Sequence, residues 1–565
     1  MRIKIQKMWG KVMRIESLIV LTLCATLAIS FISVVPLSHA GGAAPDESEE
    51  LIFYKEPECE GRGIWVWAES FSSDPNVEPM QIRDAFHNFS EAGLNFVLFL
   101  VKDSGGWLFY NSSIGPVDPR YYWDPLKVAV DEAHRFGLEL HAWFCVFRDI
   151  KVAKERPDLA MVNSTGHVST EWVCPSKPKV RKYLKSLIEE VASRYSVDGI
   201  HLDYIRFPNR TYCYCEDCRR SWLEEHPEKP WPPNSTDPSF IEFRQKLITS
   251  FIEDVQNTLK GINPKIKLSA AVFPVPKDAI NNRMQNYPEW AERGIIDFIT
   301  PMAYTSNTQE FEEWIKGTIT AAKGKTLIYA GIGLYKILEA QNPEDEFRRQ
   351  INITRTVKVT VDCSVLGVNG QVLFRYKYLE PFINATKEVY SQHAYTPHSE
   401  AIPPQIGEPI QDPPKDNVQP FQNVTITVNV TDYPTRIRKV ILHYSINNGT
   451  SWNTTVMKQV CQNTYQATIP GYQYCTWVTF KIEAFDVVGN NATKDNYGLG
   501  YTYHVIPEFQ TIHIGLLLAL MTLTIIFGIK AEKSSRSHIK STNKNLKLSH
   551  LKMKATLSLH VTCKG

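Results

Sequence analysis

The chain lacks an excess of positive charge over most of its length. It has 565 residues with 62 Lys and Arg against 60 Asp and Glu, but 14 of the basic residues and only two of the acidic ones lie in residues 1–40 and 530–565. The remaining 48 basic and 58 acidic residues give residues 41–529 a net charge of about −10. Binding to nucleic acid depends on clustered positive charge, so this balance argues against a nucleic-acid partner.

The chain also lacks the composition of a disordered protein. Apolar residues make up 43% of it and aromatic residues 11%, whereas 22% of the residues are charged. This composition predicts folded domains, and the length is sufficient for two or three of them.

Long apolar runs are scarce, with one near each end. Residues 18–35 follow five basic residues and precede Ser38-His39-Ala40, the small-x-small pattern of a signal-peptidase site. Residues 1–40 are therefore predicted to be a signal peptide, although an uncleaved anchor would have nearly the same sequence. Residues 41–58 are then a linker.

The second apolar run, residues 512–529, is long enough to cross a hydrocarbon core as a helix. Basic residues follow at once, and the positive-inside rule holds such a tail in the cytoplasm. We therefore predict a transmembrane helix over 511–530, a cytoplasmic tail over 531–565, and a cell-surface body that faces outward. Residues 506–509, with the apolar and basic segments after them, also resemble the C-terminal anchors of archaeal surface proteins.

Sites for N-linked glycosylation agree with an external body. Twelve Asn-x-Ser/Thr sequons occur, and none lies in the terminal segments. They begin at Asn88, Asn111, Asn163, Asn209, Asn234, Asn352, Asn384, Asn423, Asn429, Asn448, Asn453 and Asn491.

Between residues 59 and 395, short apolar segments alternate with amphipathic ones. Helical spacing is clearest after Pro178, where apolar residues from Val180 to Tyr195 form one stripe. Eight segments are predicted to be strands: 63–68, 96–101, 138–147, 199–205, 266–273, 298–303, 326–332 and 371–376. Eight strand-helix units predict an α/β fold, the (β/α)8 barrel, with its active site in the loops after the strands.

Three motifs in this region resemble the barrel of glycosyl-hydrolase-like family ten. They are RGIWV at 62–66, AHRFGLELHAW at 133–143 and VDGIHLDYIRFP at 197–208. The resemblance implies a barrel of glycosidase type and a glycan substrate. The chain departs from it at Lys102, which follows the second strand where family members carry Arg, at a position implied to contact substrate.

Hydrolysis of a glycosidic bond needs one carboxyl group to protonate the leaving oxygen and a second to act as nucleophile or to activate water. Four acidic residues follow strand ends and are the catalytic candidates: Glu69, Asp103, Asp149 and Asp203. Asp203 is the main candidate because it shares an inward face with His201, and a buried Asp-x-His pair is costly unless it is paired or used. The second carboxylate stays open, with Glu69 as the first choice because an aromatic strand precedes it.

Several aromatic and basic residues at or near strand ends are candidate substrate contacts. Each of them could instead pack in the core, but together they suit a sugar-binding cleft. They are Trp65, Trp67, Lys102, His141, Trp143, His201, Tyr204, Arg206 and Tyr304.

Three cysteines within six residues, Cys213, Cys215 and Cys218, indicate a metal-binding knuckle with Cys174 or Cys145 as a fourth ligand. A structural zinc ion is the predicted occupant, and the predicted catalysis requires no cofactor. The alternative is a set of disulfides among these cysteines, since disulfides persist outside the cell.

Two further disulfides are predicted. Cys59 precedes the first strand and Cys363 precedes the eighth, and closure of the barrel makes these two strands neighbours. Cys461 and Cys475 lie in the segment after the barrel and are expected to pair within it.

The region after the barrel has a different composition. Residues 396–420 are rich in proline, which predicts a stiff linker. Residues 421–505 alternate polar and apolar side chains around an Asn448-Gly449 turn, which predicts an all-β sandwich of immunoglobulin or fibronectin type. Its expected role is that of a spacer, with glycan binding as the alternative.

The sequence thus predicts a membrane-anchored glycoside hydrolase of the cell surface that acts on a polysaccharide or envelope glycan. The alternative is a non-catalytic glycan-binding or adhesion protein on the same barrel. The second carboxylate is the feature that separates the two.

Overall fold

The computed structural model describes residues 57–506 and 519–526. Eight parallel strands form a closed barrel in the order β1-β12-β9-β8-β7-β6-β3-β2. All eight predicted barrel strands are confirmed, with ends that shift by a few residues. They are β1 (Gly61–Trp67), β2 (Phe96–Lys102), β3 (Glu139–Cys145), β6 (Gly199–Asp203), β7 (Lys267–Val272), β8 (Phe298–Pro301), β9 (Leu327–Gly333) and β12 (Gly370–Phe374).

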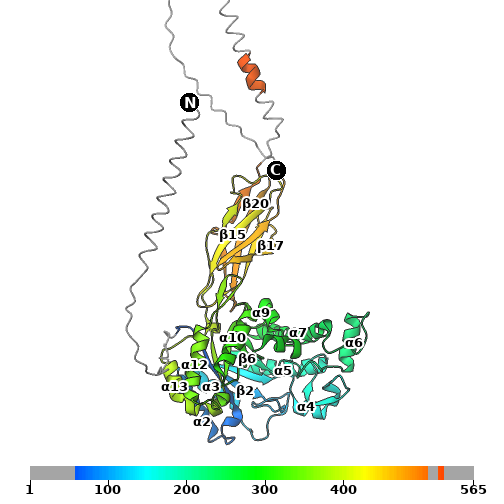
Figure 1. Ribbon diagram of the computed structural model, residues 1–565, viewed down its shortest axis with the longest axis vertical. Helices are drawn as coiled ribbons and strands as arrows, with labels where there is room; N and C mark the ends of the chain where they lie inside the picture. The colour runs from blue at the N-terminus through cyan, green and yellow to red at the C-terminus, as the bar shows by residue number, and fades with distance from the viewer. Residues whose placement is uncertain (1–56, 507–518, 527–565) are drawn as a thin grey trace, which may run out of the picture. The chain divides into compact units, whose positions relative to one another are not determined.

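Helices lie around the barrel, and Figure 1 shows strands β2 and β6 among them. The predicted stripe of α5 is confirmed, since Val180, Leu184 and Leu187 are buried and Pro178 begins the helix. The helices are α2 (Glu78–Glu91), α3 (Pro125–Arg135), α4 (Ile150–Glu155), α5 (Pro178–Arg194), α6 (Glu216–Glu225), α7 (Pro238–Ile262), α8 (Pro276–Asn282), α9 (Tyr287–Arg293), α10 (Thr308–Ala322), α11 (Leu334–Ile337), α12 (Pro343–Thr356) and α13 (Ile383–Val389).

Two hairpins interrupt the strand-helix alternation. One joins β4 (Ala160–Val162) to β5 (Val168–Val173), and the other joins β10 (Val359–Val361) to β11 (Ser364–Leu366). Their strands are too short to give a clear alternating pattern in the sequence.

An all-β region follows the barrel and contains two five-stranded sheets, parts of which appear in Figure 1 as β15, β17 and β20. Buried residues of both sheets, such as Ile426 and Leu442, belong to one core. The strands are β13 (Gln405–Ile406), β14 (Ile410–Asp412), β15 (Val424–Thr431), β16 (Ile437–Ser445), β17 (Asn453–Val456), β18 (Lys458–Cys461), β19 (Thr464–Ile469), β20 (Trp477–Asp486), β21 (Asn491–Lys494) and β22 (Tyr501–His504).

The predicted linker over 396–420 is corrected in part. Strands β13 and β14 lie within it and both pair with β15. Pro404, Pro409 and Pro413 stand just outside these short strands, at positions where proline removes no hydrogen bond of the ladder.

Both predicted disulfides outside the cysteine knuckle are wrong, because Cys59, Cys363 and Cys461 carry free thiols. The hairpin between β10 and β11 places Cys363 at its exposed turn instead of beside the first strand. Cys461 ends β18 in one sheet, whereas Cys475 precedes β20 in the other sheet.

Residues 57–506 and 519–526 contain no helix that is long and apolar enough to span a membrane. The predicted signal peptide over 1–40, most of the predicted span over 511–530, and the tail over 531–565 lie outside the described residues.

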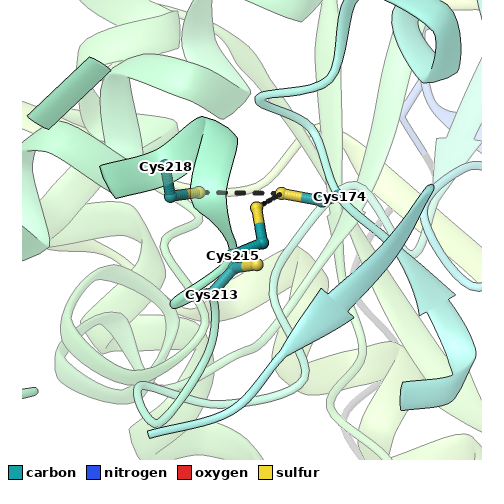
Figure 2. A group of neighbouring side chains, drawn as sticks. All are labelled: Cys174, Cys213, Cys215 and Cys218. Carbon is teal, nitrogen blue, oxygen red and sulfur yellow. Dashed lines mark hydrogen bonds between the residues drawn. The ribbon is translucent and has the colours of Figure 1, made fainter. Parts of the chain in front are cut away.

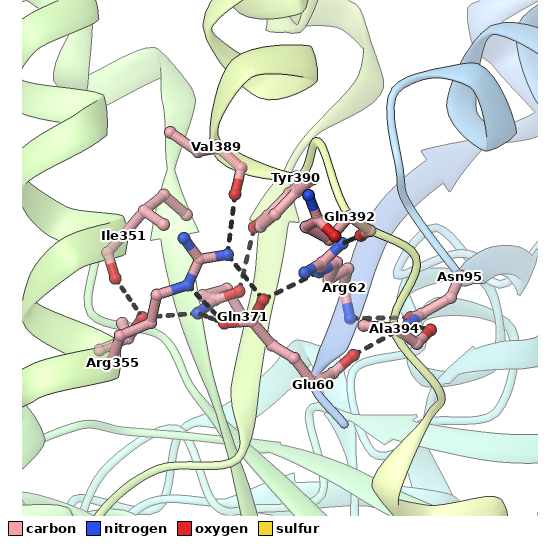
Figure 3. A network of polar contacts seen from close by, with 11 residues as sticks. Glu60, Arg62, Asn95, Ile351, Arg355, Gln371, Val389, Tyr390, Gln392 and Ala394 are labelled. Atoms are coloured by element: carbon pink, nitrogen blue, oxygen red, sulfur yellow. Dashed lines mark hydrogen bonds and ion pairs between the residues drawn. The ribbon is translucent and has the colours of Figure 1, made fainter. Parts of the chain in front are cut away.

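A buried network closes the barrel at the amino ends of β1 and β12 (Figure 3). The carboxylate of Glu60 accepts hydrogen bonds from Arg62 Nε at 2.8 Å, from Arg355 Nε at 2.9 Å and from Gln371 Nε2 at 3.0 Å. Burial alone would raise the pKa of Glu60, but Arg355, Arg62 and Gln371 outweigh it and lower the pKa. The charged form of Glu60 therefore stabilises the fold.

We expect Glu60→Gln to lower the free energy of unfolding by about 3–5 kcal/mol, because the two arginines lose their buried charged partner. The stabilisation from Glu60 is present above about pH 4.5 and is lost as the pH falls through the lowered pKa of the folded protein. Urea unfolding between about pH 3 and pH 7 measures both effects, because this range brackets the ordinary carboxyl pKa. Glu58→Gln, at an exposed position two residues away, is the control and leaves stability nearly unchanged.

Candidate active site

A cavity of about 430 Å³ lies at the carboxyl ends of the barrel strands. It is lined by Trp65, Trp67, Glu69, Leu100, Asp103, Ser104, Trp143, Cys145, Arg148, Asp203, Tyr204, Arg206, Ala271, Met302, Tyr304, Tyr335 and Phe374. Three of the four predicted catalytic residues and six of the nine predicted substrate contacts are among these residues.

Asp203 is the last residue of β6 and is buried beneath the cavity. Its Oδ1 accepts a hydrogen bond of 2.6 Å from the backbone N–H of Tyr204. Burial raises the pKa of Asp203, although the charge of Arg206 and this hydrogen bond act in the opposite direction. The raised pKa favours the protonated carboxyl group, which is the form that a general acid needs.

Glu69 and Asp103 are the other two carboxyl groups that line the cavity. Glu69, in a short 3-10 helix after β1, forms a 2.6 Å ion pair with Arg120 and is partly exposed. Asp103 follows β2 and accepts a 2.7 Å hydrogen bond from the backbone N–H of Trp107. Burial raises the pKa of Asp103, and the nearby charge of Glu69 adds to this effect.

Asp149 and Lys102 do not line the cavity. Both side chains are fully buried and form an ion pair of 3.0 Å, and Lys102 Nζ also donates to the backbone carbonyl of Cys145. Asp149 Oδ1 caps α4 by accepting from the N–H of Val152 at 2.9 Å. These partners give Lys102 and Asp149 a structural role between β2 and α4.

His201 and His141 are also fully buried and lie outside the cavity lining. Trp65 Nε1 donates to His201 Nε2 at 3.3 Å, so the proton of the neutral ring lies on Nδ1 and can bond Ser269 Oγ at 2.9 Å. His141 packs against Gly199 on β6, where a Cβ atom would overlap its ring. Burial lowers the pKa of both histidines, which suits neutral core side chains.

Aromatic rings form much of the cavity wall. Trp65 makes edge-to-face contacts with Trp143, with centroids 6.5 Å apart, and with Tyr304 at 6.4 Å. Phe374 at the end of β12 stacks on Tyr304 at 4.9 Å. The guanidinium of Arg375 lies 3.4 Å from the ring centroid of Trp67. Such rings present flat apolar faces on which a sugar ring can stack.

Arg206 places a cation beside Asp203. Its guanidinium lies over the rings of Tyr204 at 4.8 Å and of Trp172 and Phe273, both at 5.0 Å. Burial lowers the pKa of Arg206 to about 10. Within the described residues Arg206 Nε is buried without a hydrogen-bond partner, so it can donate to a group on a bound ligand.

Eight other residues of the cavity were not predicted as catalytic or substrate contacts, and Arg148, Met302, Tyr335 and Phe374 are among them. Arg148 directly precedes Asp149, and its guanidinium lies 5.6 Å from the ring centroid of Tyr204. Its place after a strand end was the available signal, but an arginine in a loop is usually solvated. Phe374 ends β12, whereas the predicted strand ran to residue 376, so its place at the strand end could not be read from the predicted bounds.

The cavity combines acidic groups that face one space with aromatic walls and two arginines. The described residues contain three groups of His, Cys, Asp or Glu side chains close enough to share a metal ion, and none of these groups lines the cavity as a set. Carboxyl groups of differing environment at one site are the arrangement used for acid and base chemistry.

Comparison with known proteins assigns the family. Residues 60–349, just over half of the chain, match the family described as glycosyl hydrolase-like 10. The chain belongs to this family. The expected resemblance of the barrel is thereby confirmed, and membership supports a glycosidase-type enzyme with a carbohydrate substrate.

The named proteins to which the chain is similar are distant in sequence. Glycosyl hydrolase DigH of Escherichia coli (strain K12) is 24% identical over 378 residues, which cover 56% of this chain and 83% of DigH. Glycosyl hydrolase YngK of Bacillus subtilis (strain 168) is 22% identical over 398 residues, covering 61% and 73%. The solved PgaB (BpsB) glycoside hydrolase domain from Bordetella bronchiseptica is 14% identical with a TM-score of 0.47, covering 59% of this chain and 98% of the domain.

The buried ion pair between Lys102 and Asp149 predicts that Asp149 contributes to the stability of the fold. Asp149→Asn should lower the free energy of unfolding by about 3–5 kcal/mol, because Lys102 is left as an uncompensated buried charge. Asp131→Asn removes the exposed Lys127 pair and should cost less than about 1 kcal/mol. Urea unfolding of both variants checks this, and an Asp149 variant of unchanged stability would contradict it.

Proposed function

We propose that the chain is a glycoside hydrolase that cleaves glycosidic bonds of a polysaccharide or envelope glycan by carboxylate acid/base chemistry. The observation that carries the proposal is the set of carboxyl groups, Asp203, Asp103 and Glu69, that face one aromatic-walled cavity at the carboxyl ends of the barrel strands. Active sites of (β/α)8 enzymes lie at this end of the barrel.

Asp203 is the general acid of the proposed reaction. Its raised pKa keeps a proton available for the leaving-group oxygen. Glu69 is the group that acts as nucleophile or activates water, because it lines the cavity and its 2.6 Å ion pair with Arg120 fixes its position there. Asp103, whose pKa burial raises, is the alternative for this second role.

The substrate is held by stacking and by hydrogen bonds. Trp65, Trp67 and Trp143 offer ring faces and edges to a sugar, and Arg206 and Arg148 offer N–H donors to hydroxyl or acidic groups. Trp65 and Trp67 come from β1 and Trp143 from β3, and both strands pair with β2, so the three tryptophans define one side of the proposed subsite.

We propose a location at the cell surface, with a cleaved signal peptide, a C-terminal membrane helix and an immunoglobulin-like spacer. The observation in support is that none of the twelve sequon asparagines is buried, so each can carry a glycan without unfolding the chain. Protease added to intact cells is expected to remove the body and to spare the basic tail, as antibodies to each part would report. Protection of the body would refute an external enzyme.

Asp203→Asn tests the catalytic assignment. Loss of the proton donor should lower turnover of an extracted cell-surface polysaccharide by about 10²–10⁴-fold, with little change in the melting temperature. Asp198→Asn, just before the opposite end of the same strand and partly exposed, should keep turnover per folded molecule near that of the wild type.

The pH dependence gives a second test. Only protonated Asp203 can donate, so the wild-type kcat/KM should fall as the pH rises through the raised pKa of Asp203, and Asp203→Asn should lack this limb. Near-normal turnover in the variant would exclude Asp203 as the acid. Glycan binding without hydrolysis, even in the wild type, would favour a non-catalytic binding protein.

A further inference from the structure

Four cysteines from separate segments meet outside the cavity lining (Figure 2). Cys174 directly follows β5, Cys213 and Cys215 lie in the loop after β6, and Cys218 is in the first turn of α6. All four side chains are buried, and their Sγ atoms lie within 4.8 Å of one another. Cys145, the other sequence candidate for the fourth position, lines the cavity instead.

We propose that Cys174, Cys213, Cys215 and Cys218 bind one structural zinc ion. Cys174 Sγ lies 3.7 Å from both Cys218 Sγ and Cys215 Sγ. A tetrahedral zinc ion with four Zn–S bonds of about 2.3 Å requires sulfur atoms about 3.8 Å apart. A disulfide would require about 2.05 Å. The sulfur positions therefore match a shared metal ion and not a bonded pair.

Arg244 gives independent support for a negatively charged centre at this place. It is fully buried, and in the described residues it pairs with no carboxylate. Its hydrogen bonds go to the backbone carbonyls of Phe240, Arg210, Tyr212 and Ser235. A buried cation needs a counter-charge, and four thiolates around a divalent ion supply a net negative one. One of these backbone carbonyls belongs to Tyr212, the residue directly before Cys213.

Polar groups also contact the sulfur atoms. The backbone N–H of Val162 donates to Cys213 Sγ at 3.3 Å. Ser176 Oγ lies 3.1 Å from Cys174 Sγ and 3.3 Å from Cys218 Sγ, so with both sulfur atoms bound to zinc as thiolates its one hydroxyl proton can be donated to one of them. Donors of this kind stabilise thiolate ligands and fix their orientation. The site is thus supplied with ligands, a counter-charge and an outer layer of donors.

The proposed ion would join two segments at the barrel rim, the one between β3 and α5 and the one that follows β6. Trp172, two residues before Cys174, contacts the ring of Tyr204 at 5.7 Å and lies under the Arg206 guanidinium at 5.0 Å. Arg206 and Tyr204 line the cavity and come from the loop after β6, which carries Cys213 and Cys215 and leads into α6 with Cys218. Zinc would therefore act as a positioning element for one wall of the cavity, without an open coordination position for chemistry.

Elemental analysis of the purified full chain tests the proposal. We expect about one zinc per chain, and loss of that zinc in Cys174→Ser and in Cys218→Ser. Cys145→Ser is the matched control, since it alters a buried thiol outside the group and should keep the metal. Stoichiometric iron in place of zinc, or zinc retained in Cys174→Ser, would overturn the assignment.

A measurement on the wild type covers variants that fail to fold. Chain refolded with Co²⁺ should show the thiolate charge-transfer and visible bands of a tetrahedral cobalt site, and removal of metal by a chelator should lower the melting temperature. Mass spectrometry that assigns any of the four cysteines to a disulfide in freshly purified protein would refute the site. These measurements do not involve glycan hydrolysis, so the zinc proposal can be tested independently of the proposed enzymatic activity.

Discussion

Closure of the barrel depends on the buried carboxylate of Glu60, which holds together the amino ends of the first and last strands. The register that it supports pairs Gly61 with Gly370 and Ile64 with Leu373. At the other end of the same two strands, this register brings Trp65 to 5.6 Å from Phe374 and Arg375 onto the face of Trp67. The aromatic wall of the cavity is therefore a consequence of how the barrel closes at its opposite end.

The remainder of the cavity depends on loops after the strands. The segment between β3 and α5 brings Trp172, and the loop after β6 brings Tyr204 and Arg206. These residues contact one another through ring and cation–π interactions, and the four-cysteine group lies where the same two segments meet. A rigid barrel thus fixes one wall, and loops that meet at the four-cysteine group supply the facing groups.

The barrel could be predicted because its strands are fully buried apolar runs; β2, for example, is buried throughout. The direction of individual side chains could not. A register irregularity between β2 and β3 separates Leu100 from Lys102, so simple alternation no longer tells which way Lys102 points. The predicted Cys59–Cys363 disulfide was wrong for a related reason. The three-residue strands β10 and β11 leave no pattern in the sequence, and their hairpin turns the chain away before β12.

The contrast between Asp149 and Asp203 explains why position after a strand was an incomplete guide to the site. Asp149 has Lys102 Nζ at 3.0 Å and a helix N–H to satisfy it, so its charge is compensated within the protein. Asp203 Oδ1 accepts from the Tyr204 N–H, and within the described residues the nearby Arg206 forms no ion pair with it, because its guanidinium lies over three aromatic rings. A buried carboxyl group without an ion-pair partner favours its protonated form. The partner of each aspartate, more than its place on the strand, therefore decides which of them can serve as an acid.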